Sequence, residues 1–164
     1  RNPIKRFISA FNLRYYLVVH SKKQENKYEN EKNILTQYEN VNNLCQELKS
    51  NPNIFNGSKK SGNYINLLKE DIFYHLENFI DQCPVEQIFG VVCHDTLDEN
   101  VQDILNISVT DDEDQDMDGY QYNKEITNEN YITLKEYLKN DYDMIDKMYE
   151  HGWITEEQYT ILKL

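Results

Sequence analysis

Apolar residues recur at helical spacing along most of this chain. The pattern begins at the first residues, where the apolar positions fall on one helical face and the polar positions on the other. Pro3 suits the first position of a helix, because its missing N–H would have no partner there. The spacing predicts a helix that begins at Pro3 and ends in the low twenties. Residues 1–20 are the first helical segment of the predicted domain. Its inward-facing residues are Ile4, Phe7, Ile8 and Phe11.

The same periodicity returns in two later regions. In residues 33–82 it predicts one helix over 34–48, stopping before Pro52, and another over 65–80, closed by Pro84. In residues 128–164 it predicts a helix from about Asn128 to Tyr149 and a last helix capped by Thr155 and Gln158. A capping box at Thr96 and Glu99 predicts a short helix between these regions. The chain is therefore expected to be mainly helical.

Residues 87–93 interrupt the helical pattern. Their sequence, Gln-Ile-Phe-Gly-Val-Val-Cys, is a short apolar run typical of a strand buried on both faces. One strand is not a sheet, and the backbone groups of Ile88–Val92 need partners. The predicted fold class is mainly α with one or two short strands. Residues 1–164 form a single domain or a domain fragment, and as a fragment the chain would have further strands upstream of Arg1.

Charge is unevenly distributed. The 29 acidic residues outnumber the 17 basic ones, and the net charge of −12 argues against nonspecific nucleic-acid binding. The first 24 residues nevertheless contain six basic residues and no acidic one, and Glu25 is the first carboxylate. Either this segregation arose by chance, or the basic end of the chain is reserved for an anion.

Two further classes of structure lack support in the sequence. No apolar run approaches the roughly 20 residues of a membrane span. Cys45, Cys83 and Cys93 have no paired short spacing, so they indicate neither a zinc site nor a disulfide framework. We expect them to be free thiols in the protein interior.

An acidic loop over residues 110–125 contains a candidate metal site. Carboxylates on alternate residues can turn toward one hard cation, and the glycine after them permits a sharp bend. The candidate calcium ligands are Asp114, Asp116, Asp118, the carbonyl of Tyr120, and Glu125. Gln121 stands where such loops carry an apolar residue, and the flanking residues fit a helix–loop–helix poorly. The alternative is a solvated run of like charges.

The start of the first predicted helix can also bind an anion. A helix N-terminus presents free N–H groups and the positive end of the helix dipole, and Arg1 stands just before it. Spacing alone favours an ordinary amphipathic helix with a solvated basic face. The residues themselves, Arg1-x-Pro-x-x-Arg6-x-x-Ser9-Ala-Phe, resemble the 3′-phosphate-binding segment of sulfotransferases that use 3′-phosphoadenosine 5′-phosphosulfate (PAPS), carbohydrate sulfotransferases above all. The resemblance is specific over residues 1–12 and returns weakly near 89–105 and 135–149.

This resemblance implies a fold, a cofactor and two site residues. The chain would be the C-terminal part of a P-loop-like α/β sulfotransferase fold. Arg1 and Ser9 would hold the 3′-phosphate of PAPS and of its product, adenosine 3′,5′-bisphosphate, with Arg6 in support. A sulfuryl group would pass to a hydroxyl acceptor, a carbohydrate being the expected class. Localisation would be the Golgi lumen for a eukaryotic carbohydrate sulfotransferase and the cytoplasm for a microbial or viral protein.

Several parts of such an enzyme are not found in this sequence. The family's 5′-phosphosulfate loop and usual catalytic base lie N-terminal to the motif, so no catalytic residue is assigned here and a missing N-terminal portion is the expected partner. His94 stands where the family usually has Glu after a strand. The alternative function is a non-catalytic helical binding or structural module, responsive to calcium through the acidic loop. Sequence upstream of Arg1 would discriminate between the two.

Overall fold

A computed structural model describes residues 1–21, 31–55, 65–88, 90–94 and 123–164. Helices contain 72% of these residues, and none of them lies in a strand. The prediction of a mainly α protein is therefore confirmed. The chain divides into two compact units, which are described separately. Unit 1 comprises Arg1–Pro3, Ile72–Asp116 and Asn140–Leu164, and unit 2 comprises Ile4–Asp71 and Met117–Lys139.

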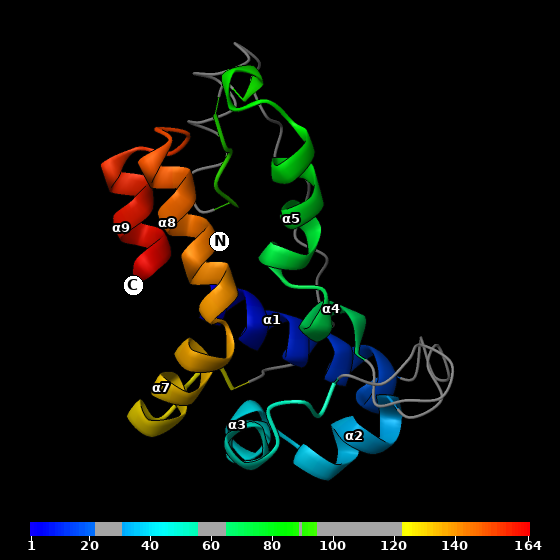
Figure 1. The fold of residues 1–164 in the computed structure, drawn as a ribbon. Helices are drawn as coiled ribbons and strands as arrows, with labels where there is room; N and C mark the ends of the chain where they lie inside the picture. The colour runs from blue at the N-terminus through cyan, green and yellow to red at the C-terminus, as the bar shows by residue number, and fades with distance from the viewer. Residues whose placement is uncertain (22–30, 56–64, 89, 95–122) are drawn as a thin grey trace. The chain divides into compact units, whose positions relative to one another are not determined.

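Helix α1 (Pro3–Tyr15) supplies much of the core of unit 2 (Figure 1). Its predicted apolar face is confirmed, because Ile4, Phe7, Ile8 and Phe11 are all buried. The helix continues as a π-helical turn, η1 (Tyr16–His20), so the predicted length also holds. The Phe7 ring meets the ring of Tyr137 edge-on at 5.9 Å, joining α1 to the end of α7 (Asn128–Tyr137).

The helix predicted over residues 34–48 is two helices. Helix α2 (Glu31–Tyr38) ends before Glu39, whose φ of 50° lies in the left-handed region. Helix α3 (Val41–Ser50) begins afresh, because the Asn40 side chain accepts a hydrogen bond from the backbone N–H of Asn43 at 3.0 Å. The apolar spacing continues across this break, so it predicted one helix. The hydrogen bond at the Asn40 cap starts a second helix there instead. Helix α3 packs against both α2 and α7.

The later helices show similar breaks. The helix predicted over 65–80 divides into α4 (Asn66–Lys69) and α5 (Ile72–Gln82). The helix predicted from Asn128 to Tyr149 divides at Leu138 into α7 and α8 (Lys139–Glu150). After α8, Gly152 has a φ of 70°, as expected for a residue that ends a helix. The last helix, α9 (Glu156–Lys163), begins with the predicted capping box of Thr155 and Gln158.

Unit 1 combines α5, α8 and α9 with the short 3₁₀ turn η2 (Val85–Gln87). The buried side chains of its C-terminal hairpin include Met144, Ile145 and Met148 from α8 and Leu162 from α9. The Asn2 side chain joins this unit by donating to the carbonyl of Leu162 at 2.8 Å. The start of the chain is thus fixed to its last helix.

The predicted strand at Ile88–Val92, within residues 87–93, is wrong for the residues described there. Gln87 belongs to η2, and Ile88 and Gly90–Cys93 are irregular. Ile88 is extended, and the backbone N–H of Val91 donates to the carbonyl of Trp153 at 2.9 Å. A ladder needs a series of such bonds, and one bond to a helical hairpin does not make a strand. Apolar composition predicted a strand here, but composition alone does not show whether a neighbouring strand is present to pair with it.

Two smaller expectations have clear outcomes. The three cysteines are free, and Cys45 and Cys93 are buried, whereas Cys83 is partly exposed. Burial raises the pKa of the Cys45 thiol to about 12, which makes it an inert core residue. Within the described parts of the chain, no helix has both the length and the apolar character needed to cross a bilayer.

Candidate functional site

The polar face of α1 presents the residues of the predicted phosphate motif. Lys5 is exposed, and Arg6 and Ser9 are each partly exposed, on the side opposite the buried apolar residues. Arg6 and Ser9 lie three positions apart, so their side chains are neighbours on the helix surface. Both belong to unit 2, which places one cation and one hydroxyl of the motif side by side.

Arg6 has unmet hydrogen-bonding capacity. Its Nη1 donates to the carbonyl of Leu67, on α4, at 3.0 Å. Its Nε and Nη2 atoms are buried, and neither has a hydrogen-bond partner among the described residues. Leaving a buried donor unsatisfied costs about 1–3 kcal/mol. The Nε and Nη2 edge of a guanidinium is also an edge that binds two oxygens of a phosphate or carboxylate. Arg6 therefore both fastens α1 to α4 and carries donors suited to an anion.

Arg1 lies in unit 1, beside a residue far away in the sequence. Its Nη2 is 3.3 Å from Nδ1 of the exposed His94. A guanidinium can only donate, so this contact requires the lone pair on Nδ1. Sequence reasoning had marked His94 only as a departure from the resembled family. The structure puts His94 in contact with Arg1, a residue of the predicted motif.

Another basic residue of the N-terminal stretch is already paired. Arg14 donates from Nε and Nη2 to both carboxylate oxygens of Glu31, at 2.7 and 2.8 Å. The pair is buried, with 3% and 1% of the side chains exposed. Arg14 thus ties α1 to α2, and it is not part of a basic surface held open for an anion. No spacing rule in the sequence linked Arg14 to Glu31.

The candidate calcium ligands Asp114, Asp116, Asp118 and Tyr120 lie outside the described residues. Of that set only Glu125 is described. It is exposed, and its backbone carbonyl accepts a hydrogen bond from Nδ2 of Asn42 at 3.0 Å. Among the residues that the structure does describe, no three His, Cys, Asp or Glu side chains are grouped to hold a metal ion. Calcium binding by the acidic loop stays a prediction.

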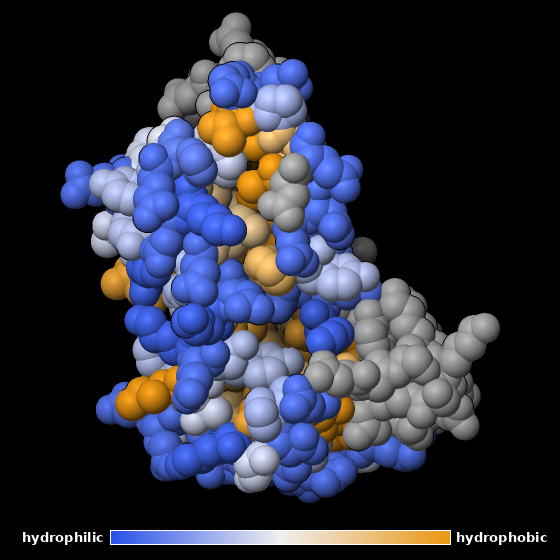
Figure 2. Space-filling model, viewed as in Figure 1, coloured by the Kyte–Doolittle hydropathy of each residue, from blue (hydrophilic) through white to orange (hydrophobic). Residues whose placement is uncertain are grey.

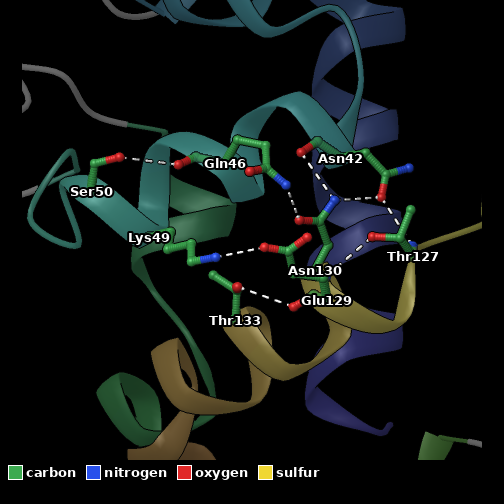
Figure 3. Close-up of polar contacts among 8 residues, drawn as sticks. All are labelled: Asn42, Gln46, Lys49, Ser50, Thr127, Glu129, Asn130 and Thr133. Atoms are coloured by element: carbon green, nitrogen blue, oxygen red, sulfur yellow. Dashed lines mark hydrogen bonds and ion pairs between the residues drawn. The ribbon is translucent and has the colours of Figure 1, made fainter.

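A polar network of side chains joins α3 and α7 in unit 2 (Figure 3). Its centre is the buried Asn130, whose Oδ1 accepts from Gln46 at 2.7 Å and whose Nδ2 donates to Oδ1 of Asn42 at 2.9 Å. Lys49 and Glu129 form an exposed ion pair at its edge, at 2.5 Å. Amide groups that satisfy one another offer neither a nucleophile nor a base. We therefore interpret this network as structural.

None of the protein-family models, curated proteins or solved structures compared with the chain matches it. The assignment of a function accordingly depends on the motif and on the geometry described above.

Proposed function

We propose that this chain is the C-terminal, 3′-phosphate-binding portion of a PAPS-dependent sulfotransferase acting on a hydroxyl acceptor, with carbohydrate as the acceptor class. The observation that carries the proposal is the motif containing Arg1, Arg6 and Ser9, set around the start of α1. The buried apolar face of α1 supports it, because this orientation leaves the motif's polar residues on the outer side.

The residues of this chain would bind and orient the nucleotide rather than react with it. Sulfuryl transfer moves an anionic group in line between two oxygens, and catalysis of such a transfer depends on positioning and on charge stabilisation. Arg1 supplies a delocalised charge for two phosphate oxygens, and Ser9 supplies a neutral hydroxyl donor. The contact with His94 Nδ1 would orient the Arg1 guanidinium toward its ligand.

Titration calorimetry with two nucleotides tests the proposal. Adenosine 3′,5′-bisphosphate carries the 3′-phosphate, and adenosine 5′-phosphate lacks it. Charge-assisted hydrogen bonds contribute about 1.5–3 kcal/mol each. Arg1→Ala should therefore weaken binding of the bisphosphate roughly ten- to a hundredfold, at about 1.4 kcal/mol per tenfold. Ser9→Ala should weaken it less, because its donor is uncharged.

The control variant is Lys5→Ala, which removes an exposed cation of the same helix that is not part of the motif. It should change the affinities for both nucleotides slightly and equally. Adenosine 5′-phosphate should bind the wild type poorly and be nearly indifferent to Arg1→Ala and Ser9→Ala. If Arg1→Ala weakened the binding of both nucleotides equally, the basic end of the chain would attract anions only through general electrostatics. The proposal would then lose its main support.

A non-catalytic helical binding module is the second candidate. It is favoured by one observation, the lack of any strand among the described residues, since the resembled fold is α/β. This candidate predicts that no variant of α1 distinguishes the two nucleotides. The same titration therefore discriminates between the two functions.

A further inference from the structure

Helix α5 displays an apolar face that the other described residues do not fully cover. Ile72, Phe73, Leu76, Phe79 and Ile80 form this face, which we call the α5 face. None of the five is buried, and Phe79 is 56% exposed. Val85 and Val92, in the following segment, are 40% and 38% exposed. Figure 2 shows hydrophobic side chains gathered on the surface of unit 1 where α5 and this segment lie.

The α5 face belongs to a helix that is anchored within unit 1. The backbone N–H of Phe73, in the first turn of α5, donates to Oδ1 of Asp141 at 2.8 Å. Asp141 lies on α8 and is completely buried. A carboxylate at this position satisfies an N–H group that has no partner within its own helix and complements the helix dipole. The N-terminal end of α5 is thus held, while apolar area toward its other end stays accessible.

The net charge of unit 1 indicates the kind of partner. No Lys or Arg occurs between residues 70 and 123. Unit 1 contains 18 acidic and 3 basic residues, whereas unit 2 contains 11 acidic and 14 basic ones. Glu77 on α5 and Glu86 beside Val85 are both exposed. A second copy of this chain would bring the same negative charge to the interface, and a cationic partner would be attracted.

We propose that the α5 face, with Val85 and Val92, binds a cationic amphipathic segment of another polypeptide. The apolar residues of that segment would cover Phe79 and Leu76, and its Lys and Arg side chains would lie against the surrounding carboxylates. An apolar centre with a charged rim is the usual anatomy of a protein interface, and helix-in-groove recognition uses the same arrangement. This proposed site does not involve nucleotide binding. Its test can therefore fail or succeed whatever the outcome of the sulfotransferase test.

Fluorescence anisotropy with three labelled peptides tests the site on the full chain. The first is a Leu/Lys peptide of about 18 residues with leucines at helical spacing. The second contains the same residues in shuffled order, and the third replaces each Lys by Glu. The Leu/Lys peptide should bind at least tenfold more tightly than either control, because it alone combines a continuous apolar face with positive charge.

Two variants locate the site. Phe79→Ser should weaken the Leu/Lys peptide roughly tenfold or more, the effect of losing one large apolar contact. Ile132→Ser is the matched control, since Ile132 is an apolar residue of unit 2 that is 67% exposed. It should leave the affinity unchanged. The double charge reversal Glu77→Lys with Glu86→Lys alters only exposed positions and should also weaken binding, with a loss that shrinks at high salt.

Each contrary outcome overturns the proposal. Equal binding of the shuffled peptide would show that charge alone is recognised, and equal binding of the Leu/Glu peptide would show unspecific apolar contact. An unaffected Phe79→Ser variant that retains the wild-type circular dichroism spectrum would place binding elsewhere. A dimer that sedimentation detects in the wild type and not in Phe79→Ser would assign the face to a second copy of the chain.

Discussion

The two units bury their apolar residues to different extents. In unit 2, α1 and α3 each turn a complete apolar face into the core, and α3 buries Val41, Leu44, Cys45 and Leu48. In unit 1, α8 buries its apolar residues, whereas α5 buries none. Unit 2 also has nearly balanced charge, while unit 1 is strongly acidic. The apolar faces of α1 and α3 are therefore packed in the core of unit 2. Unit 1 combines a packed α8 with a partly exposed apolar face on α5 and with a strongly negative charge.

The difference extends to polar contacts. Unit 2 contains the buried Arg14–Glu31 pair and the hydrogen-bond network around the buried Asn130. The ion pair between Asp146 and Lys163 in unit 1 is partly exposed, with 39% and 27% of the side chains accessible. Low dielectric strengthens a buried pair and makes the loss of one partner costly, while solvent screens a partly exposed pair.

Arg14→Ala should have the largest effect, since it leaves the Glu31 carboxylate buried without the guanidinium that neutralises it. Breaking a buried pair in this way lowers the free energy of unfolding by about 3–5 kcal/mol. Urea denaturation followed by far-ultraviolet circular dichroism measures the loss. The double variant Arg14→Met with Glu31→Leu should recover most of it, because neither charge then remains buried.

The matched control is Lys49→Ala, which breaks the exposed pair with Glu129. It should leave the urea midpoint almost unchanged, since solvent replaces the lost partner. If Arg14→Ala proved as mild as Lys49→Ala, burial would not make the Arg14–Glu31 pair more important for stability than an exposed pair of the same unit.

Two leucine substitutions compare how tightly α3 and α5 are packed. Leu44→Ala on α3 removes a completely buried side chain and should cost about 2–5 kcal/mol in unfolding free energy. Leu76→Ala on α5 removes a partly exposed side chain and should cost less than about 1 kcal/mol. Trp153, the single tryptophan, is buried in unit 1, so its fluorescence reports on that unit. Equal losses in the two variants would show that α5 is as fully packed as α3.

The positions of helices in both units could be predicted from the sequence, but the burial of their apolar faces could not always be predicted. Periodicity located α1 and its buried face correctly, because Ile4, Phe7 and Phe11 pack as their spacing requires. It also predicted a helix where α5 lies, and the apolar residues that share one side of α5 are only partly buried. Spacing tells which residues share a side of a helix, and it does not tell whether anything packs against that side.

The breaks and the site contacts were harder to predict for a physical reason. The break before α3 depends on one local bond, the Asn40 cap, within an unbroken apolar pattern. The contacts of Arg1 with His94 and of Arg14 with Glu31 join residues that only folding brings together. The proposed motif residues Arg1 and Ser9 could be named from the sequence, because the proposed motif is local. Their neighbours could not.

The smallest effect is expected at the partly exposed cluster on α8 and α9. Asp146 Oδ1 accepts hydrogen bonds from Lys163 Nζ at 2.6 Å and from Tyr159 Oη at 2.8 Å. Burial by itself would raise the pKa of Asp146, but these two bonds lower that pKa below its usual value. The folded state therefore binds this proton more weakly than the unfolded state does. The stabilisation is fully present above the unfolded pKa of about 3.9 and is lost as the pH falls through the lower folded pKa.

Asp146→Asn should consequently lower the unfolding free energy at pH 7 by only about 0.5 kcal/mol, the level of a partly exposed ion pair. The difference between wild type and variant should shrink as the pH falls below about 4, because the wild-type carboxylate is then being protonated as well. Urea denaturation followed by Trp153 fluorescence at pH 7 and pH 3 measures both values. Added salt should reduce the pH 7 difference further, since solvent screens this pair. A loss at pH 7 as large as that of Arg14→Ala would mean that unit 1 depends on desolvated ion pairs as unit 2 does, and the contrast between the units would fail.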